Sequence, residues 1–160
     1  MDSAKSLGER LLASGEILVT AESCTGGGVA TAVTDIAGSS QWFDRAYVSY
    51  SNEAKMEMLG VHAETLAQHG AVSEETVKEM VLGALQRSNA TIGVSISGIA
   101  GPDGGTEQKP VGSVCFAWAN KQGWLEVRSY QLDGDRQQVR QQAVELAIKV
   151  LCEQLSSPKS

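Results

Sequence analysis

The sequence predicts an α/β fold: a single-domain, three-layer α/β/α sandwich with a mixed, mostly parallel sheet. Helical and strand-like patterns alternate through most of the chain, which is typical of a sheet covered by helices. Two late strands are joined by the short segment Asn120-Lys121-Gln122-Gly123, which predicts a hairpin. A long helix closes the chain. Because no repeat or linker interrupts this pattern, residues 1–160 are expected to form one domain, with 156–160 as a frayed tail.

Local signals place the elements of the first half. Leu7, Leu11 and Leu12 recur at helical spacing, and Gly15 follows where a C-terminal cap is expected. A short β-rich run comes next, and a glycine turn then leads into a segment rich in Ala and Val. The predicted elements are, in order, a helix over 3–14, a strand over 17–21, a helix over 29–36, a strand over 46–51 and a helix over 52–59 that Asn52 caps and Gly60 ends.

The second half is predicted from a cap and an apolar stripe. Ser73 and the two acids after it indicate a helix start, and Val77, Met80 and Val81 begin an apolar stripe that continues to Arg87. We expect this to be the longest central helix. The remaining predicted elements are strands over 90–97, 113–119 and 124–132 and a closing helix over 135–155.

Charge and cysteine content argue against several function classes. A formal net charge of −6 speaks against a duplex nucleic-acid partner, because such proteins usually present a basic surface to phosphate. Cys24, Cys115 and Cys152 are widely spaced and odd in number, so neither a disulfide framework nor a metal site is indicated. No segment approaches the roughly 18 apolar residues of a membrane span, and the N-terminus lacks a signal-peptide pattern. We therefore expect a cytoplasmic protein without a nucleic-acid or membrane partner.

Two glycine-rich segments follow predicted strands. Residues 98–112 hold five glycines and two prolines, which let backbone N–H groups approach a ligand closely. Ser97 directly precedes this loop and Thr106 lies within it, and their hydroxyls are candidates to hold an anion or a carbonyl. Residues 22–27 form a strand-to-helix turn, where ligands of α/β sheets tend to bind. This turn is neither a P-loop nor a GxGxxG fingerprint, and any tight βα turn also uses glycine and hydroxyl caps.

A base and a nucleophile are suggested by three residues on neighbouring elements. Tyr50 lies at the end of a predicted strand and Lys55 in the first turn of the next helix, so both face one edge. Burial and the positive end of a helix dipole lower the pKa of a lysine, which makes Lys55 a candidate general base with Tyr50 as proton relay. Ser40, in a preceding turn, is a candidate nucleophile. Each residue also has a structural interpretation: a solvated lysine, a packed tyrosine and a turn serine.

Two further side chains bear on the chemistry. Cys24 stands beside a predicted helix N-terminus, which favours the thiolate and makes it an alternative nucleophile, although a small buried cysteine is also common. Arg136 stands at the start of the last helix and is a candidate partner for a phosphate or carboxylate, although most such arginines are merely exposed.

Three ordered motifs, at residues 21–27, 50–55 and 97–105, resemble the CinA C-terminal domain family, and the resemblance spans nearly the whole chain. It implies hydrolysis of the carboxamide of nicotinamide mononucleotide to nicotinic acid mononucleotide and ammonia, in NAD recycling. It implies no metal and no cofactor. It also implies an oligomer, for which we expect a homodimer.

Residue roles follow from the same motifs. The resemblance implies Ser40 as nucleophile, Lys55 as its base and Tyr50 as relay. The residues that it implies for substrate binding are Ser23, Thr25, Gly26, Gly27, Ser97, Gly101, Gly105, Thr106 and Arg136. The family often has threonine at the position of Ser97, so the hydroxyl is preserved. A catalytically silent nucleotide-binding or regulatory module is the alternative, because some chains of a family keep a pocket after losing its chemistry.

Overall fold

The computed structural model describes residues 3–155, so the predicted frayed tail over 156–160 lies outside the described residues. The helices are α1 (Ala4–Ser14), α2 (Gly28–Thr34), α3 (Asn52–Leu59), α4 (Ala63–His69), α5 (Glu74–Gln86) and α6 (Arg136–Leu155), with a short 3-10 helix, η1, at Ser39–Gln41. The strands are β1 (Leu18–Glu22), β2 (Phe43–Val48), β3 (Ile92–Gly98), β4 (Ser113–Asn120) and β5 (Leu125–Gln131).

The strands form one mixed sheet in the order β2-β1-β3-β4-β5. β1 pairs in parallel with both β2 and β3, whereas β4 runs antiparallel to β3 and to β5. The mixed sheet is confirmed, but it is evenly divided between parallel and antiparallel pairs rather than mostly parallel. The reason is that the glycine loop after β3 returns the chain directly into β4 without a crossover helix.

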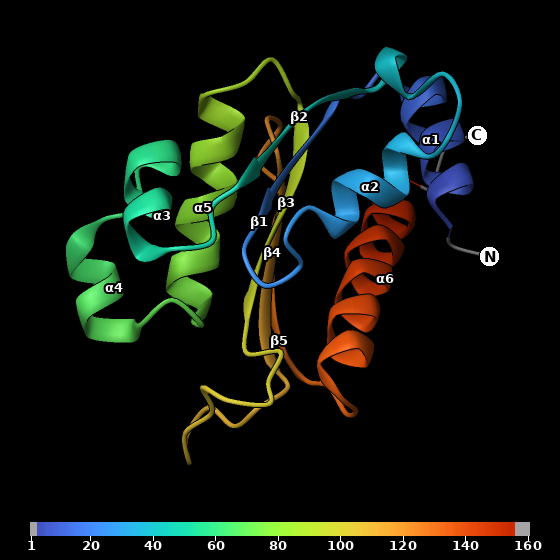
Figure 1. Ribbon diagram of the computed structural model, residues 1–160. Helices are drawn as coiled ribbons and strands as arrows, with labels where there is room; N and C mark the ends of the chain where they lie inside the picture. The colour runs from blue at the N-terminus through green and yellow to red at the C-terminus, as the bar shows by residue number, and fades with distance from the viewer. Residues whose placement is uncertain (1–2, 156–160) are drawn as a thin grey trace.

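Helices cover both faces of the sheet, which confirms the three-layer arrangement. α3, α4 and α5 lie on one face, and α1, α2 and α6 lie on the other (Figure 1). Side chains of β1 alternate between the two cores, because successive residues of a strand point to opposite faces. Leu18 packs with the α1, α2 and α6 layer, whereas Val19 and Ala21 pack with α5. The same alternation determines which polar side chains meet at the candidate active site.

The second strand begins and ends three residues earlier than predicted. β2 ends at Val48, so Tyr50 and Ser51 follow the strand instead of belonging to it. Ser51, not Asn52, caps α3, and its side chain accepts a hydrogen bond from the Ala54 N–H at 3.0 Å. The short helix α4 was not predicted.

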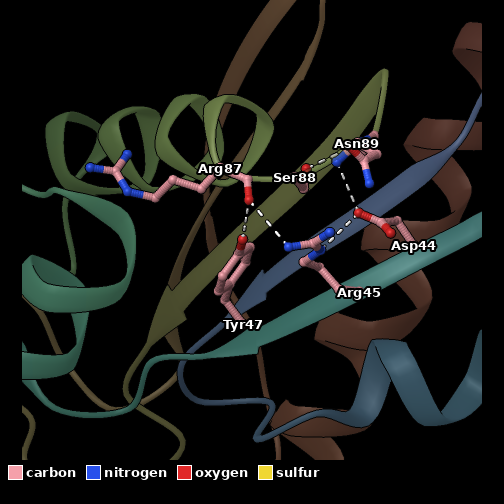
Figure 2. Close-up of polar contacts among 7 residues, drawn as sticks. Asp44, Arg45, Tyr47, Arg87, Ser88 and Asn89 are labelled. Atoms are coloured by element: carbon pink, nitrogen blue, oxygen red, sulfur yellow. Dashed lines mark hydrogen bonds and ion pairs between the residues drawn. The ribbon is translucent and has the colours of Figure 1, made fainter.

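Polar side chains tie the edge strand β2 to the end of α5 (Figure 2). The Tyr47 hydroxyl and the Arg45 guanidinium both donate to the Arg87 carbonyl, at 2.8 and 3.3 Å. Asp44 accepts hydrogen bonds from Arg45 and from the Asn89 N–H. The Arg87 carbonyl at the helix end, which lacks an intrahelical partner, is thereby satisfied. β2, which has a strand neighbour on one side only, is thus held in place just before the segment that carries Tyr50.

Gly83 lets α3 and α5 approach each other closely. A Cβ atom at this position would lie 1.9 Å from the Leu59 carbonyl oxygen. Alanine normally stabilises a helix interior by about 1 kcal/mol relative to glycine, but here the clash with backbone reverses the sign. We expect Gly83→Ala to lower the free energy of unfolding by about 2 kcal/mol in urea denaturation. A Gly83→Ala midpoint equal to or above that of the wild type would contradict this packing.

Candidate active site

Ser23 and Lys55 meet at the carboxyl end of β1. Ser23 directly follows β1, and strand alternation turns its side chain toward the face covered by α3. Lys55 lies in the first turn of α3 and reaches back over the same edge. Its Nζ atom lies 3.0 Å from Ser23 Oγ, although the two residues are 32 positions apart. A lysine and a serine hydroxyl in direct contact are the minimal parts of a base-activated nucleophile.

Lys55 is almost completely buried, with 1% of its surface exposed. Burial penalises the ammonium form and lowers the pKa of Lys55 below its ordinary value, with a smaller opposing effect from Cys24. The part of the sequence prediction that concerns burial is therefore confirmed. The neutral amine becomes more available near neutral pH than that of an exposed lysine.

The hydrogen bonds of Lys55 match the two protonation states of a base. Its Nζ atom contacts three oxygens: Ser23 Oγ and the carbonyl oxygens of Ser49 and Tyr50, at 3.0 to 3.1 Å. The ammonium donates to all three. A neutral amine keeps two N–H bonds for the two carbonyls, and its lone pair then faces Ser23 Oγ. Proton transfer from Ser23 to Lys55 therefore needs no rearrangement of the amine.

Ser40 lies at the other end of the sheet, which contradicts its placement beside Lys55. It belongs to η1, just before β2, where the Leu18 N–H donates to the Trp42 carbonyl at the start of β1. This segment lies beside α1 (Figure 1). The six residues of β2 separate it from Lys55 by about 20 Å of extended chain. Ser40 was predicted to lie beside Lys55 because the two are close in sequence, but the extended strand β2 separates them.

Glu22 organises the turn that presents Ser23. Its side chain is fully buried on the opposite face of β1. It accepts four hydrogen bonds, from the hydroxyls of Thr20 and Thr25 and from the N–H groups of Val29 and Ala30 in the first turn of α2. A carboxylate in this position caps the helix and complements its dipole. The turn is thereby fixed on both sides of Ser23.

The remaining members of this turn play structural parts. The Thr25 hydroxyl is committed to Glu22 and buried, so its predicted contact with substrate is not supported by its side chain. Gly26 and Gly27 both have positive φ, at 59° and 96°, which glycine adopts without strain. The Gly26 N–H donates to the Ser23 carbonyl at 3.0 Å. These glycines give the chain the sharp bend that leaves Ser23 at the sheet edge.

Tyr50 contributes its backbone and its side chain to different contacts. Its carbonyl oxygen accepts from Lys55 and from the Ser23 hydroxyl. Its side chain, in a residue that is 60% exposed, receives a hydrogen bond from Arg136 at 3.3 Å. Arg136 also donates to the Gly101 carbonyl at 2.8 Å. The predicted residues Tyr50, Gly101 and Arg136 are therefore connected to one another, and Tyr50 reaches Ser23 through its backbone carbonyl. The phenol contacts Arg136 rather than the Lys55 amine.

Of the other predicted residues in and beside the glycine loop, Ser97 lies near Ser23, whereas Thr106 and Gly105 make contacts within the loop. Ser97 is buried at the end of β3, next to Ile96, whose carbonyl accepts the Ser23 N–H. Strand alternation turns Ser97 toward the same face as Ser23. Within residues 3–155, the hydrogen bonds of Thr106 are with Lys109, across its own loop. Gly105 packs closely against Val111: a Cβ atom added at Gly105 would lie 2.6 Å from the Val111 backbone nitrogen. Thr106 and Gly105 thus shape the loop, and in the part of the chain that the structure describes neither forms a hydrogen bond with Ser23.

Two contributors to the site were not predicted. Ser49 presents its carbonyl to Lys55. Arg140 donates to the carbonyls of Cys24 and Thr25, at 3.0 and 3.2 Å, and so secures the turn from α6. Arg140 lies one helical turn after Arg136, so the two share a face, and this spacing is the signal that sequence reasoning missed.

Cys24 is buried, and burial raises the pKa of its thiol to about 11. The helix N-terminus that was expected to favour the thiolate is instead capped by Glu22. At pH 8 about one thiol in a thousand is ionised. If the chain releases ammonia as the resemblance of its motifs implies, we expect Cys24→Ala to keep the wild-type rate within about threefold, and iodoacetamide to leave the wild type active. Loss of activity in both experiments would restore Cys24 as a nucleophile.

Residues 3–155 contain no group of three His, Cys, Asp or Glu side chains that could hold a metal ion. In the same part of the chain, no helix is long and apolar enough to cross a membrane. The absence of a cofactor stays a prediction.

A protein-family model described as the CinA C-terminal domain matches residues 1–155. The chain belongs to the CinA C-terminal domain family. Relatives within this family include a protein of Escherichia coli K12, named nicotinamide-nucleotide amidohydrolase PncC, which is 56% identical over 96% of this chain and 93% of its own. A Pseudomonas putida protein of the same name is 49% identical over 91% of this chain and 90% of its own.

Solved structures of the family share the fold. A CinA superfamily protein from Klebsiella pneumoniae 700603 superimposes with a TM-score of 0.92 at 43% identity, covering 96% of this chain and 95% of its own. The five-stranded mixed sheet with helices on both faces is therefore the fold of this family.

Proposed function

We propose that the chain is an amidohydrolase that converts nicotinamide mononucleotide to nicotinic acid mononucleotide and ammonia, as a step of NAD recycling in the cytoplasm. The observation that carries this proposal is the contact between Lys55 Nζ and Ser23 Oγ in a buried setting. The names of the relatives supply the substrate. The nucleophile that we propose is Ser23, which replaces Ser40.

In the first half-reaction, Lys55 accepts the proton of Ser23, and Ser23 Oγ attacks the carboxamide carbon. The Cys24 N–H follows the nucleophile directly in the turn, and we assign it to the developing oxyanion, as at other strand-to-helix nucleophile turns. The C–N bond then breaks, and the Lys55 ammonium returns its proton to the leaving nitrogen, which departs as ammonia. An ester between Ser23 and the nicotinoyl group remains.

In the second half-reaction, water replaces ammonia. Lys55 accepts a proton from water, the oxygen attacks the ester carbon, and the bond to Ser23 Oγ breaks as Lys55 returns the proton to that oxygen. Arg136 and the Tyr50 phenol lie at the exposed side of the site, where we assign them to the anionic part of the nucleotide. An acidic chain thereby still offers a local cation to its substrate.

An ammonia-release assay with three substrates tests the proposal. The chain is incubated with nicotinamide mononucleotide, nicotinamide riboside or nicotinamide, and ammonia and acid products are measured. We expect turnover of the mononucleotide and at least about tenfold lower kcat/KM for the riboside, because Arg136 loses its phosphate partner. Calorimetric binding of the mononucleotide with no product over hours would instead identify a silent nucleotide-binding module.

A further inference from the structure

The outer edge of β5 carries backbone groups that no strand of the described chain satisfies. The β4–β5 pairing settles which groups these are. The Asn120 N–H donates to the Trp124 carbonyl, and the Leu132 N–H donates to the Gly112 carbonyl. Hydrogen-bonded pairs recur at every second residue of an antiparallel ladder, so the even-numbered residues of β5 turn their N–H and C=O groups toward β4. The odd-numbered residues from Leu125 to Gln131 turn theirs outward. An open edge of this kind is a template for pairing with another strand.

We infer that the outer edge of β5 pairs antiparallel with the same edge of a second copy of the chain, with Val127 opposite Val127 of the partner subunit. A two-fold interface uses the same surface on both copies, so one residue must face itself across the axis. The outward hydrogen-bonding groups require odd-numbered residues to pair with odd-numbered residues, and an axis at any central residue from Leu125 to Ser129 satisfies this. An axis at Glu126 or Arg128 would place like charges directly opposite each other, which is destabilising. Leu125, Val127 and Ser129 are therefore the remaining candidates.

The charges of β5 select Val127 among these candidates. With the axis at Val127, Glu126 lies directly opposite Arg128 of the partner subunit, in a pair whose Cα atoms are about 4.5 Å apart. Glu126 and Arg128 are already ion-paired within one chain. The four side chains then alternate in sign around the axis. An axis at Leu125 or Ser129 places no charge opposite a charge of β5.

The side chains at this edge are disposed for such a contact. Arg128 lies over the Trp118 ring, with its Cζ atom 5.7 Å from the ring centroid, and donates to the Tyr130 hydroxyl at 3.0 Å. Both its side chain and that of Glu126 are roughly one third exposed. On the other sheet face, Leu125, 40% exposed, would lie opposite Ser129 of the partner subunit. The paired edges would exchange about six backbone hydrogen bonds.

The molar mass in solution tests the interface. We expect light scattering of the full chain at 200 μM to give twice the 16.9 kDa of one chain. Val127→Pro removes the central outward N–H without removing a bond to β4, because proline is tolerated on a strand edge. We expect this variant to be monomeric, and Val127→Thr to stay dimeric as its matched control. A monomeric wild type, or a Val127→Pro variant that is folded and dimeric, would overturn the proposal.

Charge reversal tests the register. Glu126→Arg and Arg128→Glu each place like charges opposite each other, and we expect each to raise the dimer Kd at least about tenfold. An equimolar mixture of these two variants restores opposite charges at both positions, so we expect heterodimers with nearly wild-type affinity. This rescue also shows that the variants are folded. Single variants as dimeric as the wild type, or a mixture without rescue, would contradict the register.

Cross-linking gives an independent measure of the axis. In a hydrogen-bonded antiparallel pair the Cα atoms are about 5.5 Å apart, which a disulfide spans. We expect Val127→Cys to form a covalent dimer on mild oxidation. Leu125→Cys should not, because its position faces Ser129 of the partner subunit. The native cysteines are all buried and provide a low background. Equal cross-linking of the two variants would exclude an axis at Val127.

Discussion

Ser23→Ala is expected to lower kcat for nicotinamide mononucleotide by at least about 10³-fold, because it removes the attacking oxygen of the proposed reaction. Lys55 keeps its two carbonyl partners in this variant, so the fold and the substrate affinity are expected to change little. Single-turnover ammonia release and calorimetric binding of the substrate measure the two quantities separately. Mass spectrometry of quenched wild-type enzyme is expected to show an acyl adduct that carries the whole nicotinic acid mononucleotide on the peptide that contains Ser23, and none in the variant.

Ser40→Ala is the matched control for this experiment. It also removes one serine hydroxyl, but at the opposite end of β2, so we expect kcat within about twofold of the wild type. The reverse result, with Ser40→Ala inactive and Ser23→Ala active, would return the nucleophile to Ser40 and refute the assignment based on the Lys55 contact.

Lys55→Met is expected to lower kcat by about 10²- to 10⁴-fold, because the variant keeps a chain of similar length but has no proton acceptor. Lys55→Arg should be equally impaired, since guanidinium stays protonated. In the wild type, kcat/KM is expected to rise with pH as Lys55 loses its proton, with a midpoint below the ordinary lysine pKa of 10.5. A flat pH profile, or activity in Lys55→Arg, would exclude Lys55 as the base.

The same pKa predicts how stability depends on pH. The folded-state pKa of Lys55 is lowered, so between it and the unfolded value of 10.5 the unfolded chain binds more protons. The free energy of unfolding therefore rises with pH in this window, and the full cost of burying the ammonium is present below it. Urea titrations at pH 7, 8.5 and 10 are expected to show a steeper rise for the wild type than for Lys55→Met. Identical slopes would mean that burial does not perturb Lys55.

Short-range signals predicted several elements well. α1 begins after a Ser3 side chain that accepts from the Ser6 N–H, and it ends at Gly15 with positive φ. Ser73 caps α5 in the same way. Such caps are decided within four residues of chain, which is why they can be read from sequence. α4 was missed because its N-cap, His62, makes no side-chain cap and gives no start signal.

The errors at the site arose where distance in space departs from distance in sequence. Ser40 is nearer than Ser23 to Lys55 along the chain, but the extended β2 carries it away. Ser23 comes close because β1 lies beside β2 in a register that pairs Glu22 with Val48. For Cys24, the turn sequence suggested an activated thiol, whereas burial and the cap from Glu22 oppose it.

The sequence by itself determined the family, the α/β class and the positions of most elements, and it indicated Lys55 as a candidate base, because motifs, caps and periodicity are properties of neighbouring residues. Only the tertiary structure decided which hydroxyl faces that lysine. That choice depends on strand order, on the pairing of β1 with β2 and on the burial of the amine. These quantities arise when segments tens of residues apart pack together, and no local pattern encodes them.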